Sequence, residues 1–445
     1  MVKVTGRTRR ALLGSAFAGA GATAASAQSA PGRSGGLRPN SSQDQTVLLQ
    51  RALAIAAREG TPVHLPPGRF RIGGLVLPSG ARLVGAGAGA TVLVQANTQP
   101  MLVARGAGPL TLRDFTIEGN SAASRTTPLV SLADVTGLDM SDLALTGSDG
   151  AAVRLERCGG RIERNTISDV DVAIFSLDAT GLQIVGNVVD RCANNGIQVW
   201  RSQKGFDGTQ VLGNRISSVL TTAGGSGQNG NGINVFRAGG VIVGQNVIRD
   251  CAFTAIRNNS GDNVQILGNS CANLGEVAIY AEFAFEGCVV ANNVVDRASV
   301  GISITNFNEN GRLAVANGNM LRNLVRRLDP ALGSYHGGTG ISVEADTSVT
   351  GNVVESAEFA GIAIGHGIYQ RDVVCSSNVV RRCSYGVTVS VVPNSGTAQI
   401  TNNILSECSR GRVVAFEFDK SVAGDLAESP DRRFAHLMVH GNTGR

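Results

Sequence analysis

The amino-acid sequence predicts an all-β fold, a right-handed parallel β-helix with coils of about 22–33 residues and an N-terminal capping α-helix. Two observations favour this solenoid. Asparagine recurs at intervals of 22 to 33 residues along most of the chain, with apolar residues at fixed offsets from it. The 445 residues also include 58 glycines and only 4% aromatic residues, which suits short strands joined by tight turns.

Ten asparagines anchor the repeat. They are Asn165, Asn187, Asn214, Asn246, Asn269, Asn293, Asn319, Asn352, Asn378 and Asn403. The residues three before, two after and five after each anchor are apolar or small, as short strands with alternate buried side chains require. One coil has no core of its own, so we expect the coils to stack and the asparagine amides to bond from coil to coil. The antiparallel hairpins of a propeller or sandwich would not keep one register through ten units.

The first residues have the order of a twin-arginine signal peptide, expected over residues 1–27. Arg9 and Arg10 precede an apolar stretch that ends in the small-residue site Ala25-Ser26-Ala27. The formal net charge of +5 includes four basic and no acidic residues from this segment, so the mature chain would be near +1. We therefore expect a periplasmic or secreted protein exported by the twin-arginine machinery, with no nucleic-acid partner. No run in the mature chain is apolar and long enough to span a membrane.

Two segments are expected between the signal peptide and the coils. Residues 28–41 are rich in Ser, Gly and Pro and predict a flexible linker. Residues 42–60 predict an amphipathic helix, with Ser42 and Gln45 as a capping box and Gly60 as the stop. This helix would cover the open end of the solenoid, so residues 42–445 would form a single β-helix domain with its own cap.

Two segments carry resemblances to known proteins. Residues 41–93, from SSQDQTVLLQ to GAGATVL, are similar to the opening of pectate-lyase-like β-helix proteins, which implies the fold and no one activity. The leader together with GNGINVFRAGGVIVGQNVIRDCAF and LGEVAIYAEFAFEGCVVANNVVD resembles the twin-arginine-translocated uncharacterised repeat protein family over nearly the whole chain. That resemblance implies export and fold, and it brings no catalytic residues with it.

A second strand follows each repeat position, and alternation sends two of its residues outward. The first outward column is Gln198, Asn234, Arg257, Tyr280, Ser303, Ser342 and Ala363. The second is Trp200, Phe236, Asn259, Glu282, Thr305, Glu344 and Gly365. We call these two columns the strip. Aromatic faces beside charged and amide groups suit a sugar polymer, whereas the alternative is an ordinary solvated sheet face.

Two insertions enter just before strands of the strip. Residues 221–231 and 326–339 are expected to wall the binding face, although length variation at a surface loop is the alternative. His336 lies in the second insertion and His366 follows the strip, and each could serve as a general base or be merely solvated.

The strip supports several hypotheses for a polysaccharide or cell-envelope glycan partner. In a polysaccharide lyase or epimerase, which we favour, Tyr280 or Arg257 would remove a proton beside a uronate carboxylate. In a glycoside hydrolase, Glu282 and Glu344 would be the carboxylate pair, two coils and about 9–10 Å apart. The third hypothesis is a noncatalytic scaffold that binds a cell-envelope glycan. The substrate-binding candidates are Trp200, Phe236, Gln198, Asn234, Asn259, His336 and His366.

Eight cysteines do not predict a disulfide framework. Cys192, Cys251, Cys383 and Cys408 share one buried repeat position, so we expect them to act as small apolar residues. A bridge is geometrically conceivable between Cys383 and Cys408, which fall in neighbouring coils. No carboxylate cluster has calcium-binding spacing, so we expect no cofactor, and no residue pattern argues for calcium.

Overall fold

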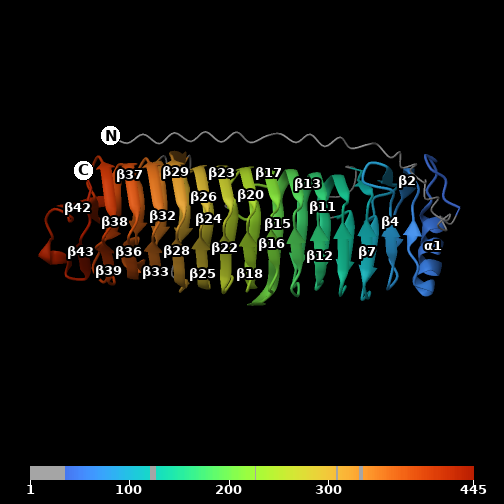
Figure 1. Ribbon diagram of the computed structural model, residues 1–445, viewed down its shortest axis with the longest axis horizontal. Coiled ribbons are helices and arrows are strands. Elements are labelled where there is room, and N and C mark those ends of the chain that lie inside the picture. Colours follow the sequence, from blue (N-terminus) through green and yellow to red (C-terminus); the bar gives the residue numbers. More distant parts are fainter. Residues whose placement is uncertain (1–35, 121–126, 226, 307–308, 330–333, 445) are drawn as a thin grey trace, which may run out of the picture. The chain divides into compact units, whose positions relative to one another are not determined.

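The computed structural model describes residues 36–444 apart from 121–126, 226, 307–308 and 330–333. The predicted signal peptide and most of the predicted linker lie outside the described residues. The described chain forms stacked coils in which each turn contributes strands to three parallel ladders (Figure 1). The predicted right-handed parallel β-helix is therefore confirmed.

The first ladder is a sheet of fifteen strands. They are β1 (Val63–His64), β4 (Arg82–Val84), β7 (Leu110–Arg113), β10 (Leu138–Ser141), β12 (Gly160–Glu163), β14 (Gln183–Val185), β16 (Gln210–Leu212), β19 (Ile242–Gly244), β22 (Val264–Leu267), β25 (Glu286–Ala291), β28 (Arg312–Asn317), β33 (Ala345–Thr350), β36 (Arg371–Ser376), β39 (Ala398–Thr401) and β43 (Leu437–His440).

The second ladder is made of the strands that, from β13 onward, start one residue after an anchor asparagine. It contains β2 (Gly68–Ile72), β5 (Thr91–Gln95), β8 (Thr116–Glu118), the first parts of β11 (Ala144–Glu156), β13 (Thr166–Leu177) and β15 (Val188–Phe206), then β17 (Arg215–Val219), β20 (Val247–Cys251), β23 (Ser270–Leu274), β26 (Val294–Ala298), β29 (Met320–Leu324), β34 (Val353–Ala357), β37 (Val379–Cys383) and β40 (Ile404–Cys408).

The third ladder carries the strip. It contains β3 (Leu75–Val76), β6 (Leu102–Arg105), β9 (Val130–Ala133), the later parts of β11, β13 and β15, then β18 (Asn231–Gly239), β21 (Ile256–Asn259), β24 (Val277–Glu282), β27 (Val300–Ile304), β32 (Thr339–Val343), β35 (Ala360–Ile364), β38 (Tyr385–Ser390) and β41 (Val413–Glu417). Two antiparallel pairings interrupt the pattern: β30 (Arg326–Asp329) with β31 (Ser334–Gly337), and β41 with β42 (Lys420–Asp425). Short 3-10 helices occupy Gly367–Tyr369 and Arg432–Phe434.

The ten anchor asparagines form one buried column, as predicted. At each step the Oδ1 of one asparagine accepts from both the backbone N–H and the Nδ2 of the asparagine one coil earlier. For Asn214 and Asn246 these distances are 2.9 and 3.0 Å. The Nδ2 of Asn246 also donates to the carbonyl of Val211 at 2.9 Å, and Asn442 extends the column by one coil. Because each polar group in the column finds a partner, the amides can be buried without a desolvation penalty.

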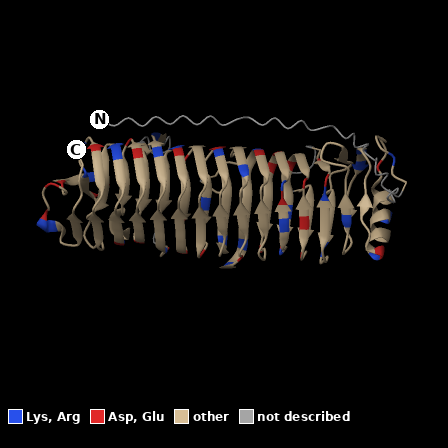
Figure 2. Cartoon of the chain, in the orientation of Figure 1, with Lys and Arg blue, Asp and Glu red and all other residues tan. Residues whose placement is uncertain are grey.

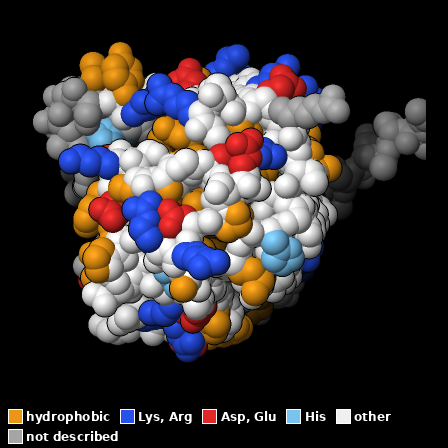
Figure 3. All heavy atoms as spheres, turned by 90° about the vertical axis from the view of Figure 1, so that its left-hand side faces the viewer, with side chains coloured by type: hydrophobic (Ala, Val, Ile, Leu, Met, Phe, Trp, Pro, Cys, Tyr) orange, Lys and Arg blue, Asp and Glu red, His pale blue; other side chains and the backbone are white. Residues whose placement is uncertain are grey.

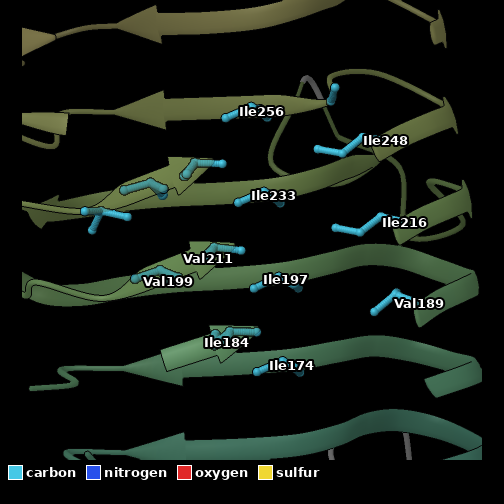
Figure 4. Close-up of a cluster of buried hydrophobic side chains, with 14 of the residues drawn as sticks. Ile174, Ile184, Val189, Ile197, Val199, Val211, Ile216, Ile233, Ile248 and Ile256 are labelled. Atoms are coloured by element: carbon cyan, nitrogen blue, oxygen red, sulfur yellow. The ribbon is translucent and has the colours of Figure 1, made fainter. Parts of the chain in front are cut away.

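The core consists of stacked apolar columns. Figure 4 shows Ile174, Ile197, Ile233 and Ile256 lying one above another, beside a second column that includes Val189, Ile216 and Ile248. All the residues at the three predicted offsets are buried except Cys408, which is partly exposed. The eight cysteines are free, and Cys192, Cys251 and Cys383 are buried as predicted, whereas Cys408 is partly exposed.

Helix α1 (Thr46–Glu59) covers the first coils with Leu49, Ala52 and Leu53 buried beneath it. It is shorter than predicted at both ends. The capping-box prediction is wrong, because Gln45 is the N-cap and makes no side-chain cap bond, while Asp44 Oδ1 accepts from the N–H of Thr46 at 2.8 Å. Gly60 ends the helix in the left-handed conformation, as predicted.

The chain ahead of α1 already contacts the solenoid. Leu37 is buried, the N–H of Arg38 donates to Gln45 Oε1 at 2.7 Å, and the N–H of Asn40 donates to the carbonyl of Arg69 at 2.9 Å. Residues 36–41, which were expected to belong to the flexible linker, therefore pack against the first coils instead.

The C-terminal end is also covered. Strand β42 folds back on β41, and Val422, Phe434 and Leu437 pack against the core. Charged side chains lie among the apolar ones on this end of the molecule (Figure 3). Such a surface discourages another sheet edge from pairing with the last coil. Among the described residues, no helix is long and apolar enough to cross a membrane.

Candidate functional site

The two columns of the strip lie in register on the third ladder. Gln198 pairs with Asn234, Asn234 with Arg257, and Arg257 with Tyr280. In the second column Trp200 pairs with Phe236, Phe236 with Asn259, and Asn259 with Glu282. The first column continues through Ser303, Ser342 and Ala363 to Thr388. The sequence columns are therefore rows of spatial neighbours, as predicted.

Aromatic rings cover the strip at the coils of β13, β15 and β18. The Phe175 and Trp200 rings lie 5.4 Å apart, and the Trp200 and Phe236 rings also lie 5.4 Å apart. All three side chains are partly exposed. Sequence reasoning missed Phe175, although it occupies the first column one coil before Gln198. The rings form a continuous platform of the kind on which sugar rings stack.

A charged cluster occupies the middle of the strip. Arg257 donates to Glu282 Oε1 from Nε at 2.6 Å and from Nη2 at 2.5 Å. Asn259 Nδ2 donates to the same oxygen at 3.0 Å. Arg257 and Glu282 are 9% and 2% exposed, so this part of the strip is closed to solvent rather than open as predicted.

The insertion at residues 221–231 contacts this cluster at Arg257. Gly227 sits so close to Arg257 that a side chain there would place its Cβ 1.9 Å from Arg257 Nη1. Asn231 Nδ2 donates to the Gly227 carbonyl at 2.8 Å, and Asn195 Nδ2 donates to the Gln228 carbonyl at 3.2 Å. The insertion lies over the strip, whereas the sequence predicted a wall beside it.

Electrostatics in this cluster disfavour the predicted bases. Burial raises the pKa of Tyr280, and the charges of Glu282 and Glu276 raise it further, so the phenol stays protonated. The guanidinium of Arg257, which offers hydrogen-bond donors and no acceptor, is occupied by the Glu282 carboxylate. Neither side chain can readily remove a proton, and the roles proposed for Tyr280 and Arg257 lose their physical support.

Glu276 also belongs to this cluster. Burial raises the pKa of its carboxyl, as it does that of Glu282, while Arg257 opposes the rise in both. Its Oε2 is buried without a hydrogen-bond partner among the described residues. Sequence reasoning missed Glu276 because it lies in the turn before β24, outside the two columns.

The predicted hydrolase pair is engaged by the protein itself. Glu282 binds Arg257 and Asn259, and Glu344 Oε2 accepts from the backbone N–H of Asn306 at 2.6 Å. Both carboxylates are buried. A catalytic pair must reach the glycosidic bond from two sides, and neither glutamate is available to do so in this arrangement.

A cavity of about 480 Å³ opens at the C-terminal end of the strip. Its floor is the continued strip, made of Ser342, Ala363, Gly365, Thr388, Ser390 and Phe416. The small residues Ala363 and Gly365 stand where the middle of the strip has Tyr280 and Glu282. They leave the space that larger side chains fill elsewhere.

Two walls rise from opposite ends of the strands beneath this cavity. The β30–β31 hairpin, which precedes β32, contributes Tyr335 and His336. The turn after β35 contributes His366, and the hairpin between β41 and β42 contributes Phe418 and Asp419. The structure thus brings His336 and His366 into one cavity.

Hydrogen bonds and ring contacts hold the walls in place. Arg326 Nη2 donates to the carbonyl of Tyr335 at 2.6 Å, which ties the two strands of the hairpin together. The His366 and Phe418 rings lie 6.0 Å apart, edge to face. Ser390 Oγ donates to the carbonyl of Gly367 at 2.8 Å, which fixes the turn that carries His366. Among the described residues, no group of three or more His, Cys, Asp or Glu side chains could hold a metal ion.

Comparisons with known proteins agree with the architecture. A family model described as a right-handed β-helix region matches residues 202–368. No curated protein matches the sequence. The N-terminal fragment of bacteriophage phi29 gene product 12 is 16% identical, with a TM-score of 0.51, over 91% of this chain and 69% of that one. The class that fold and comparisons define is the right-handed β-helix proteins.

Two further solved structures are similar at lower scores. The catalytic unit of an α-1,3-glucanase from Streptomyces thermodiastaticus is 16% identical, with a TM-score of 0.45, over 95% of this chain and 70% of its own. A mannuronan C-5 epimerase A-module from Azotobacter vinelandii is 14% identical, with a TM-score of 0.39, over 91% and 96%. At such identities the likeness is one of fold.

Proposed function

We propose that the chain is a carbohydrate-active β-helix protein that binds a polysaccharide along the strip and transforms it in the C-terminal cavity by lyase or epimerase chemistry. The observation that carries this proposal is the composition of the cavity. Two imidazoles, an arginine, a carboxylate and several aromatic rings surround a floor of small and hydroxyl-bearing residues. Rings and hydroxyls suit a sugar, and imidazoles suit proton transfer.

The chemistry begins at the carbon beside a uronate carboxylate. Arg326 would pair with that carboxylate and stabilise the charge that develops as the proton leaves. One imidazole takes the proton, the C–O bond to the neighbouring sugar breaks, a C=C bond forms, and the leaving oxygen gains a proton. In an epimerase the proton would return to the opposite face of the carbon. His336 and His366, on opposite walls, suit such a two-sided exchange.

Product analysis tests this proposal. The protein is incubated with polyuronates and neutral glycans, and ultraviolet absorbance reports unsaturated products while NMR reports epimers. His336→Ala and His366→Ala are compared with His64→Ala on β1, a histidine outside the cavity. We expect at least one of the two cavity variants to lose about 10²–10⁴-fold in turnover, while the control keeps it.

Two outcomes would refute the catalytic part. Full turnover in both cavity variants would place the chemistry elsewhere. Glycan binding without any product would instead support the noncatalytic scaffold. The Glu282 and Glu344 hydrolase remains the weaker alternative, because both carboxylates are already bonded within the protein.

We also propose export by the twin-arginine pathway to the periplasm or beyond. The order of residues 1–27 supports this proposal. Replacing Arg9 and Arg10 by lysine should keep the protein in the cytoplasm in a fractionation experiment.

The chemistry proposed above needs no cofactor, so turnover should survive treatment with a chelator. Loss of turnover after this treatment would contradict the proposal that no metal ion takes part.

A further inference from the structure

Four arginines lie over aromatic rings at the two ends of the strip. Arg154 is 4.9 Å from the Phe175 ring centre and Arg237 is 4.7 Å from that of Phe236. With Trp200 these residues form the N-terminal platform. The C-terminal platform consists of Arg326, 5.9 Å from the Phe359 ring, and Arg410, 6.0 Å from the Tyr385 ring, together with Phe416.

These four arginines differ from the arginines along the edges of the coils. Arg157, Arg164 and Arg191 each pair with an aspartate one coil earlier, at 2.6, 2.8 and 2.7 Å. Figure 2 shows basic and acidic residues together along the upper edge of the view. Within the described part of the chain, the side chains of Arg154, Arg237, Arg326 and Arg410 lie within 4 Å of no carboxylate, in contrast to Arg157 and Arg257. These four guanidinium groups are therefore not in salt-bridge contact with a carboxylate, although Glu358 Oε2 accepts from the backbone N–H of Arg326.

The guanidinium groups keep hydrogen-bonding capacity for a ligand. Arg237 Nη1 donates to the carbonyl of Ser202 at 3.2 Å, and the guanidinium of Arg154 makes no hydrogen bond with the described residues. A guanidinium has five N–H donors, so most of them remain available. Contact with an aromatic ring fixes the arginine before a ligand arrives, which reduces the entropy lost on binding.

We propose that the glycan is a polyanion, whose carboxylate or sulfate groups pair with the arginines. Its rings stack on the partly exposed rings, Phe175, Trp200 and Phe236 at the N-terminal platform and Phe359 at the C-terminal one, where the buried Tyr385 and Phe416 support Phe359 from within. This inference rests on the proposed function, which places one uronate carboxylate in the C-terminal cavity, and it extends the charge requirement to the part of the chain that binds the N-terminal platform. Arginine binds such oxyanions through two parallel hydrogen bonds, so a charged chain gains contacts that a neutral chain lacks. The platforms lie five coils apart, about 24 Å, so long chains should bind more tightly than chains that reach one platform.

The protein contains one tryptophan, Trp200, and it reports directly on the N-terminal platform. Its fluorescence is followed while an unesterified polyuronate, or the same polymer fully methyl-esterified, is added. We expect at least tenfold tighter binding of the charged polymer, with affinity that falls as salt rises. The double variant Arg154→Gln, Arg237→Gln should lose this preference. Arg157→Gln, whose arginine pairs with Asp134, should keep it.

The outcomes separate this inference from the proposed function. Equal binding of charged and esterified polymers, or an unchanged preference in the double variant, would overturn the polyanion inference and leave glycan binding intact. A preference for a sulfated glycan over its unsulfated counterpart would support the inference with sulfate as the anion. Failure of every charged and neutral glycan to bind would refute both.

Discussion

The middle of the strip and its C-terminal end share one backbone register but differ in accessibility. On β21 and β24, the paired Arg257 and Glu282 are buried, and Gly227 of the insertion at 221–231 packs against the Arg257 guanidinium. On β32, β35 and β38, Ala363 and Gly365 leave a cavity between two walls. The same ladder thus carries a closed charged cluster and an open, aromatic-walled site.

This difference shows what an open site on a solenoid requires. Stacking supplies rows of neighbours at every coil, yet long side chains in those rows bond to each other and close the surface. Small floor residues together with walls from flanking loops are needed to admit a ligand. We therefore expect the charged residues of the middle coils to contribute to stability and the small residues of the end coils to leave room for a ligand.

The largest expected effect is on the stability of the middle coils. Glu282→Ala leaves Arg257 buried without its partner, so we expect the free energy of unfolding to fall by about 3–5 kcal/mol. Urea unfolding measures this change. Glu286→Gln, which removes an exposed pair with Arg312, should cost less than about 1 kcal/mol. Equal losses in the two variants would mean that the cluster is not a stabilising unit.

The asparagine column allows the same comparison within the core. Asn246→Ala leaves the N–H and Nδ2 of Asn214 without their acceptor, so a loss of about 2–3 kcal/mol is expected in urea unfolding. Asn442→Ala, at the C-terminal end of the column where the residue is partly exposed, should cost clearly less. Equal losses of unfolding free energy in Asn246→Ala and Asn442→Ala would argue against burial as the cause of the larger loss at Asn246.

Filling the cavity tests the open end. Ala363→Phe should weaken glycan binding about tenfold, or about 1.4 kcal/mol, because the new ring occupies the floor. Isothermal titration calorimetry with the best glycan measures this affinity. Val374→Phe on β36 adds a ring to the first ladder, away from the cavity, and should bind normally. Unchanged binding by Ala363→Phe would show that the glycan binds outside this cavity.

The smallest expected effect is a pH dependence in the closed cluster. Burial raises the pKa of the Glu276 carboxyl above its ordinary value, so the folded state holds this proton more tightly than the unfolded state. The stability that this proton contributes is present below the unfolded pKa and is lost as pH rises through the folded pKa. Glu276→Gln cannot lose a proton there, so its stability relative to the unchanged protein should improve with rising pH. Urea unfolding from pH 4 to pH 8 checks the sign, and a constant difference would refute it.

Much of the strip could be predicted from the sequence, but its accessibility could not. Alternation along the strands correctly placed Trp200 beside Phe236 and Arg257 beside Tyr280, since register follows from the repeat. Whether a loop lies beside the strip or over it depends on contacts such as Gly227 against Arg257. Such contacts join residues far apart in sequence and leave no periodic signal. Phe359 and Phe418 were missed for the same reason, whereas Phe416 continues the second column and follows from extending it by two coils.

The sequence by itself determined the solenoid, because every coil must repeat the residues that stack on its neighbours, and the asparagine column and apolar offsets record that requirement. The tertiary structure alone decided which part of the strip is closed and which is hollow. The accessibility of each part depends on hydrogen bonds, ion pairs and steric contacts between insertions and side chains. These contacts each involve particular residues and do not repeat from coil to coil.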